Sequence, residues 1–120
     1  MRLAIVGSRD LVGKILATTA IHDALDRHRP TLVISGGATG IDSMAEDIAR
    51  ARGIAVKVYA PTRMAWDGPD GFKARNREIA HACDVLVRIA SATTSTYGSG
   101  WTREYAESIG KPTENIIITP

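Results

Sequence analysis

The chain has 120 residues, of which 44% are hydrophobic and 23% are charged, and its formal net charge is +2. We interpret these values as one globular domain over residues 1–120, and the interspersed charges give no strong case for a nucleic-acid surface. No apolar run approaches the roughly 18 residues of a membrane span, and the single cysteine, Cys83, excludes an internal disulfide. These features predict a cytoplasmic protein without a membrane partner.

Five short apolar runs are rich in β-branched residues and mostly lack polar alternation, which is typical of strands buried on both faces. They are Leu3 to Val6, Leu32 to Ile34, Ala55 to Val58, Val85 to Ile89 and Ile116 to Ile118. Helical periodicity predicts four helices between them, over Leu11 to Arg27, Ile41 to Arg52, Phe72 to Ala82 and Thr102 to Ile109. This alternation predicts an α/β, Rossmann-like domain, with a parallel five-stranded sheet of order 3-2-1-4-5 and helices on both faces.

The connections that follow the strands carry the unusual residues, and this edge is where open α/β sheets bind ligands. The first connection begins with Gly7, Ser8 and Arg9. A guanidinium at that position can pair with a phosphate in bidentate fashion. A solvated surface arginine is an equally good interpretation of Arg9.

The second connection contains three glycines and two hydroxyl residues and opens a predicted helix. Its residues are Ser35, Gly36, Gly37, Ala38, Thr39 and Gly40. Glycines allow a ligand to approach the backbone, and a helix start offers free N–H groups to a phosphate. A tight turn is the alternative, but three glycines favour anion binding. Asp42, in the first helical turn, can complement the helix dipole, which its spacing favours, or bind a ribose hydroxyl.

Arg75 and Asn76 lie near the start of the third predicted helix. Residues three or four apart share a helix face, so Arg75 should face inward with Ile79 while Arg77 points elsewhere. An inward arginine at the ligand-binding edge can clamp a phosphate or a carboxylate.

A second glycine-containing loop, from Ser95 to Thr102, opens the fourth predicted helix, and the same phosphate-binding argument applies to it. Its candidate ligand-binding residues are Gly98, Ser99, Gly100 and Thr102. A hydroxyl-rich surface loop is the alternative. Three of the six aromatic residues, Trp66, Tyr97 and Trp101, fall on this edge and can stack on a base or simply close the loops.

The histidines and the cysteine do not indicate a metal site or a nucleophile. His22, His28 and His81 lack metal-ligand spacing to one another, to Cys83 or to carboxylates. Cys83 is expected in the core. The sequence therefore predicts no required cofactor and no metal.

The motifs also occur in the order found in a known superfamily. They are Ile5-Val6-Gly7-Ser8-Arg9, Ser35 to Asp42, Ala74 to Ala80, Asp84, and the Gly-Ser-Gly-x-Thr sequence from Gly98 to Thr102. Together they resemble the SLOG superfamily, which includes small YspA-like proteins, cytokinin-activating LOG enzymes and the DNA-processing protein DprA (Smf). The resemblance implies a Rossmann-like fold, a pocket for a nucleotide or nucleotide derivative, a homo-oligomer, and ligand-binding roles for Asp42, Arg75 and Asn76.

Three functions follow from these observations. The leading hypothesis is a sensor or binding module for a nucleotide-like ligand. The resemblance to LOG enzymes implies, as an alternative, hydrolysis of the N-glycosidic bond of a nucleoside 5′-monophosphate by Arg75 and Glu104. Glu104 lies two residues after Thr102, where the LOG pattern places its glutamate at three. The resemblance to DprA implies single-stranded DNA binding, which the near-neutral charge does not favour.

Overall fold

The computed structural model describes residues 1–11, 14–61, 63–69, 71–92 and 97–119. Its strands are β1 (Arg2–Gly7), β2 (Leu32–Ser35), β3 (Ala55–Val58), β4 (Val85–Ser91) and β5 (Thr113–Ile118). Its helices are α1 (Ile15–His28), α2 (Ile41–Ala51), α3 (Phe72–Ala82) and α4 (Tyr97–Ser108), and a short 3-10 helix, η1 (Arg9–Leu11), follows β1.

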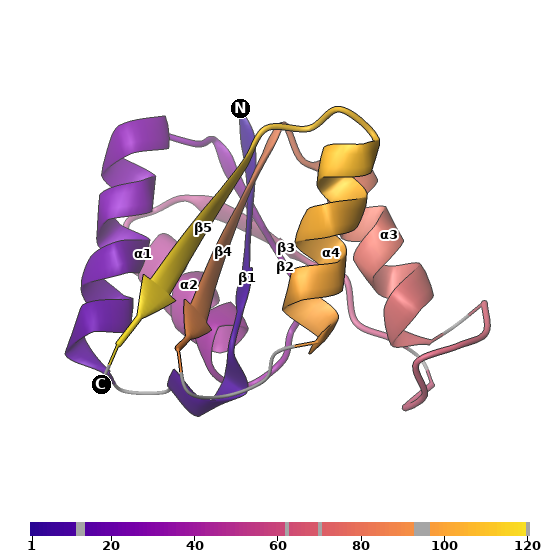
Figure 1. The fold of residues 1–120 in the computed structure, drawn as a ribbon. Helices are drawn as coiled ribbons and strands as arrows, with labels where there is room; N and C mark the ends of the chain where they lie inside the picture. Colours follow the sequence, from indigo (N-terminus) through magenta and orange to yellow (C-terminus); the bar gives the residue numbers. More distant parts are fainter. Residues whose placement is uncertain (12–13, 62, 70, 93–96, 120) are drawn as a thin grey trace.

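All five strands run parallel in the order β3-β2-β1-β4-β5 (Figure 1). The predicted fold class and strand order are therefore confirmed. The chain first winds outward from β1 to β3 and then returns to the other side of β1 with β4. This return places the amino- and carboxyl-terminal halves of the sheet next to each other at β1 and β4.

The helices cover the two faces of the sheet in pairs. In Figure 1, α1 and α2 lie on one side of the sheet, and α3 and α4 lie on the other. Alternate residues of β1 serve the two faces, because successive strand side chains point in opposite directions. Leu3 and Ile5 pack with α1 and α2, whereas Ala4 and Val6 pack with α3 and α4.

Three element boundaries differ from the prediction by three residues or more, and the others differ by two residues at most. Helix α1 begins at Ile15, after a backbone at Lys14 that is still extended, instead of at Leu11. Strand β5 begins at Thr113 because its polar first half also pairs with β4. Helix α4 begins at Tyr97, five residues earlier than predicted, so Gly98, Ser99 and Gly100 belong to its first turn.

None of the helices that the structure describes has the length and apolar character that crossing a bilayer requires.

Candidate functional site

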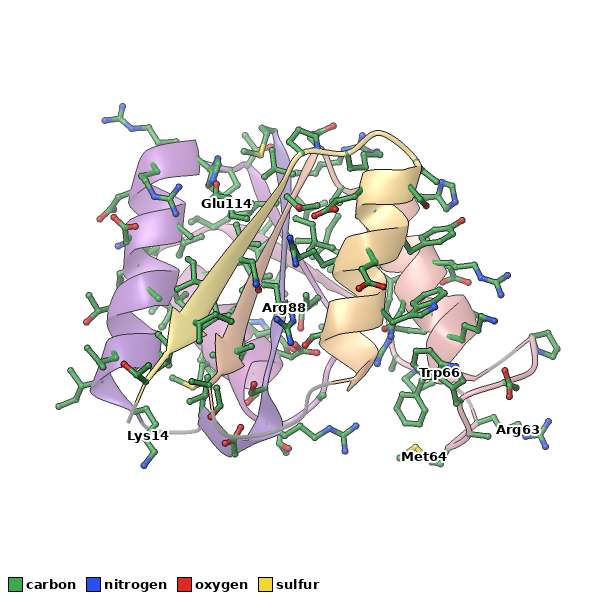
Figure 2. All side chains as sticks on the ribbon, viewed as in Figure 1. Lys14, Arg63, Met64, Trp66, Arg88 and Glu114 are labelled. Atoms are coloured by element: carbon green, nitrogen blue, oxygen red, sulfur yellow. The ribbon has the colours of Figure 1, made fainter. Side chains whose placement is uncertain are left out.

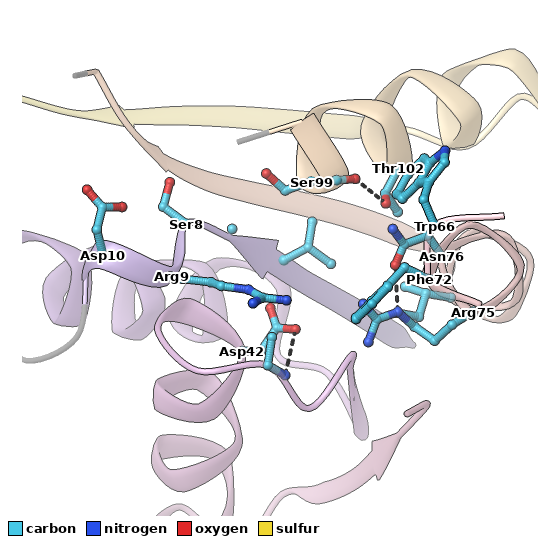
Figure 3. Close-up of a pocket in the computed structure, with 15 residues that line it drawn as sticks. Ser8, Arg9, Asp10, Asp42, Trp66, Phe72, Arg75, Asn76, Ser99 and Thr102 are labelled. Atoms are coloured by element: carbon cyan, nitrogen blue, oxygen red, sulfur yellow. Dashed lines mark hydrogen bonds between the residues drawn. The ribbon is translucent and has the colours of Figure 1, made fainter. Parts of the chain in front are cut away.

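A cavity of about 460 Å³ opens at the carboxyl edge of the sheet, where β1 and β4 end side by side (Figure 3). The connection after β1 leads to α1 on one face, and the connection after β4 leads to α4 on the other. The chain diverges at this point, which is the switch point at which open parallel sheets bind ligands. Val6 and Ile79 contribute apolar surface to its lining.

The end of β1 packs closely against β4. A Cβ atom on Gly7 would lie 1.9 Å from the carbonyl oxygen of Ile89, so only glycine fits there. The amide of Ser8 donates to the same carbonyl at 3.1 Å, and the Ser8 hydroxyl accepts the amide of Ser91 at 2.8 Å. Gly7 and Ser8 thus join the two strands that border the cavity.

The loop between β2 and α2 uses much of its hydrogen-bonding capacity internally. The Gly37 amide donates to the Ser35 hydroxyl at 3.2 Å, and the Ala38 amide donates to Asp42 Oδ2 at 3.3 Å. The Ser35 hydroxyl also donates to Glu46 at 2.6 Å. Of the six residues from Ser35 to Gly40, Ala38 alone lines the cavity. The loop is therefore a turn held by its own hydrogen bonds, and it presents few free backbone amides to a ligand.

Arg75, on α3, lines the cavity and is hydrogen-bonded to the loop between β2 and α2. Its Nη1 donates to the carbonyl oxygens of Gly36 and, at 3.3 Å, Tyr59, while its Nε donates to Asn76 at 2.6 Å. In the part of the chain that the structure describes, Nη2 has no hydrogen-bond partner. Arg75 is 9% exposed and lines the cavity, so Nη2 is the group that it can offer to a ligand.

Asp42 is a buried carboxyl group that lines the same cavity. Burial raises the pKa of Asp42 from its ordinary value of 3.8 to about 6, against the opposing effects of the Ala38 amide and the charge of Arg75. Burial likewise lowers the pKa of Arg75, an effect that Asp42 opposes and Arg9 reinforces. An arginine keeps its charge under such conditions, so the cavity wall retains a cation.

A second guanidinium reaches the cavity from η1. The side chain of Arg9 extends into the cavity above Asp42, and Arg75 lies on the far side beside Phe72 (Figure 3). Both guanidinium carbons lie over the Phe72 ring, at 5.9 Å for Arg9 and 5.4 Å for Arg75. Two cations and an aromatic face therefore surround one space, an arrangement suited to an anionic ligand with a planar group.

The start of α4 forms the opposite wall. Gly98, Ser99 and Thr102 line the cavity, and the Thr102 hydroxyl donates to the Gly98 carbonyl at 2.7 Å. Arg88, which lies over the sheet beside α4 (Figure 2), donates from Nε to the Ser99 hydroxyl at 3.0 Å. The predicted loop residues 93–96 lie outside the described part of the chain. The residues of this wall that the structure describes therefore belong to the first two turns of α4.

Glu104, the catalytic candidate, is exposed on α4 and does not line the cavity. It lies near Arg88, on which its charge acts. Residues 98 and 102 share the inward face of this helix, and Glu104, two residues further on, points about 200° away from Thr102. The structure thus brings Arg75 to the cavity but not Glu104.

An aromatic row extends outward from the cavity along α3 and α4. Trp66 lines the cavity and meets Trp101 edge to face, with ring centroids 5.4 Å apart. Trp101 stacks on Tyr105 at 5.3 Å, and Tyr105 meets His81 at 5.5 Å. These contacts close the loop between β3 and α3 onto α4. The side chain of Tyr97 lies outside the described part of the chain.

The amino-terminal half of the chain identifies its family. The model of the YspA, cpYpsA-related SLOG family matches residues 1–65, which is more than half of the chain and includes the Gly7–Arg9 and Ser35–Asp42 motifs. The chain belongs to this SLOG family. Among proteins of curated function, no sequence matches it significantly.

The fold of this SLOG chain is also similar to a solved structure, that of DNA processing protein A (DprA) from Streptococcus pneumoniae. The TM-score is 0.70 at 20% sequence identity, and the match covers 95% of this chain and 49% of the DprA chain. The SLOG chain thus spans about half the length of that protein. At this identity the similarity shows the fold alone.

Most of the predicted ligand-binding residues of the SLOG chain meet at the cavity. Those that line it are Gly7, Ser8, Arg9, Ala38, Asp42, Arg75, Asn76, Gly98, Ser99 and Thr102. Those that do not are Ser35, Gly36, Gly37, Thr39, Gly40 and Gly100. Sequence reasoning missed four lining residues: Val6, Asp10, Phe72 and Ile79. Three of these are apolar residues of predicted strands or helices, whose pattern indicates only a core position.

Among the described residues, no three histidine, cysteine or carboxylate side chains are grouped so that they could hold a metal ion. Cys83 is fully buried in the core between the sheet and α3, as predicted.

Proposed function

We propose that this SLOG protein is a binding module for a nucleotide or nucleotide-derived small molecule, held in the cavity between η1, α2, α3 and α4. The observation that carries the proposal is the convergence of Arg9 and Arg75 on one cavity, with both guanidinium groups near the Phe72 ring. The guanidinium groups supply donors for a phosphate, and Phe72 and Trp66 supply aromatic surface for a base. A volume of about 460 Å³ lies within the range of small-molecule sites.

The two arginines have different roles in the proposed complex. Arg75 is tied to the loop carbonyls and positions α3, so its removal would also disturb the fold. Arg9 is exposed, and its contact within the described residues is with the Phe72 ring. Arg9 is therefore the residue whose loss should affect the ligand more than the protein.

We expect Arg9→Ala to weaken binding of a nucleoside monophosphate about 10- to 100-fold, because a charge-assisted hydrogen bond contributes about 1.5–3 kcal/mol. Isothermal titration calorimetry measures this effect, and thermal melting should show an unchanged fold. Arg77→Ala is the matched control, since it removes the same charge from an exposed position of α3 outside the cavity. Equal losses in the two variants would contradict a specific role for the cavity.

Hydrolysis is the function that the arrangement supports less well. A general acid or base must reach its proton within about 3 Å, directly or through one water. Glu104 is exposed outside the cavity lining, so we propose binding without base release. NMR spectra of a nucleoside monophosphate incubated with the protein for hours test this point. Free-base signals that disappear in Glu104→Gln would replace the binding proposal with an enzymatic one.

A further inference from the structure

The hydrogen bonds of Asp42 are incomplete. Its Oδ2 accepts the Ala38 amide at 3.3 Å, and the Gly36 amide also lowers its pKa, but among the ion pairs of the described residues none joins an arginine to this carboxylate. The residue is 6% exposed and lines the cavity. In Figure 3 the second carboxylate oxygen is turned towards the space occupied by the Arg9 side chain. The buried carboxylate therefore presents an acceptor to the cavity.

The place of Asp42 in the first turn of α2 explains only part of why a buried carboxylate stands there. The helix start stabilises a negative charge, and the Ala38 amide satisfies one oxygen. The other oxygen keeps acceptor capacity on the side of the cavity, where a donor group of a ligand can reach it. A second anionic group would be repelled there. A neutral donor, such as a hydroxyl group, would be accepted.

The nucleotide proposed above has such donors on its sugar. Arg9 and Arg75 attract its phosphate, Phe72 and Trp66 offer surface to its base, and the ribose joins these two parts. Asp42 lies on the wall between η1 and α3, where the sugar of a ligand held at both ends would pass. Resting on the proposed function, we infer that Asp42 accepts hydrogen bonds from the ribose hydroxyls, so that the cavity selects ribonucleotides over 2′-deoxyribonucleotides.

The test compares matched sugars. Dissociation constants are measured by calorimetry for adenosine, guanosine, cytidine and uridine 5′-monophosphates and for the 2′-deoxy counterpart of whichever binds. We expect the ribonucleotide to bind about 10- to 100-fold more tightly, the range expected for a hydrogen bond to a charged group. In Asp42→Asn this preference should fall to about threefold or less, whereas in Arg9→Ala both sugars should lose affinity equally.

The outcomes separate this inference from the proposed function. Equal affinity for the two sugars in the unaltered protein, with binding still dependent on Arg9, would overturn the role of Asp42 and leave the binding proposal intact. Absence of binding by every ribonucleotide would overturn both. A preference that persists undiminished in a folded Asp42→Asn protein would assign the selection to another group. If Asp42→Asn does not fold, the affinities of the unaltered protein for the two sugars still test whether the cavity selects ribonucleotides, and equal affinities would overturn the inference.

Discussion

Replacing Gly40 by alanine is expected to destabilise the protein by about 3–5 kcal/mol, a large part of the stability of a domain of this size. Gly40 has φ of 89° and ψ of −132°, a backbone conformation that L side chains rarely adopt. An added Cβ would also lie 2.3 Å from the Ser8 carbonyl oxygen and 2.5 Å from Arg9 Cα. Both contacts are with backbone, so relief requires η1 to move away from α2. The substitution should therefore damage the cavity together with the fold.

Gly53→Ala is the matched control for this prediction. Gly53 also has a positive φ, 75°, but an added Cβ would meet no atom within 4 Å. Its substitution should cost only the conformational strain, about 1–2 kcal/mol. Urea unfolding of the two variants measures the difference. Similar losses at both positions would mean that the close packing of α2 against η1 does not determine the need for glycine at residue 40.

A second large effect is expected from the ionisation of Asp42. The pKa of Asp42 is raised in the folded state to about 6, above its ordinary value of 3.8. Between these values the folded state binds more protons than the unfolded state, so the stability falls as pH rises through this window. The predicted loss between pH 4 and pH 8 is about 2–3 kcal/mol.

Asp42→Asn isolates this contribution. The amide is close in shape to the carboxyl group and does not ionise, so the difference in unfolding free energy between the two proteins should grow in favour of the variant as pH rises. Two other carboxyl groups have lowered pKa values, Asp84 because of Arg2 and Glu114 because of Arg27 and His28. They titrate in both proteins, so their contributions cancel in the difference of unfolding free energies. A pH-independent difference would show that the ionisation of Asp42 does not govern this stability.

This prediction bears on function. A neutral residue at position 42 would avoid the cost of burying a charge, yet the chain keeps a carboxyl group there, facing the cavity. Residues that lower stability in this way are concentrated at functional sites. The burial of the Asp42 carboxyl group at the cavity therefore explains both its cost in stability and its proposed contact with the ribose.

The strand order was predictable because its determinants are local. Runs such as Val85 to Ile89 identify buried strands, and the alternation with helices restricts the topology to few choices. The boundaries of β5 and α4 were not predictable in the same way. The polar residues Thr113 to Asn115 join β5 through pairing with β4, and Ser99 in the first turn of α4 is held by Arg88, eleven residues earlier. Both contacts depend on tertiary structure.

The glycines of the second connection were interpreted as allowing a ligand to approach, and the structure assigns several of them to packing. A Cβ atom on Gly36 would lie 2.6 Å from Arg75 Nη1 and 2.8 Å from Asp42 Oδ2, so this glycine makes room for two cavity residues. Sequence alone does not separate these roles, because both require a residue without a side chain. Phe72 was missed for the converse reason, since an aromatic residue at a helix start resembles a core residue.

The proposed nucleotide site lies at the carboxyl edge of the sheet. The most direct measurement is a titration of the isotopically labelled protein with ribonucleoside 5′-monophosphates, followed in amide correlation spectra. We predict saturable shifts at cavity-lining amides, including Gly7, Ala38 and Ser99, with Leu16 and Ile117, which lie outside the cavity lining on the α1 and β5 surface, unchanged. Spectra that no ribonucleotide alters, or shifts confined to the α1 and β5 surface, would contradict the proposal.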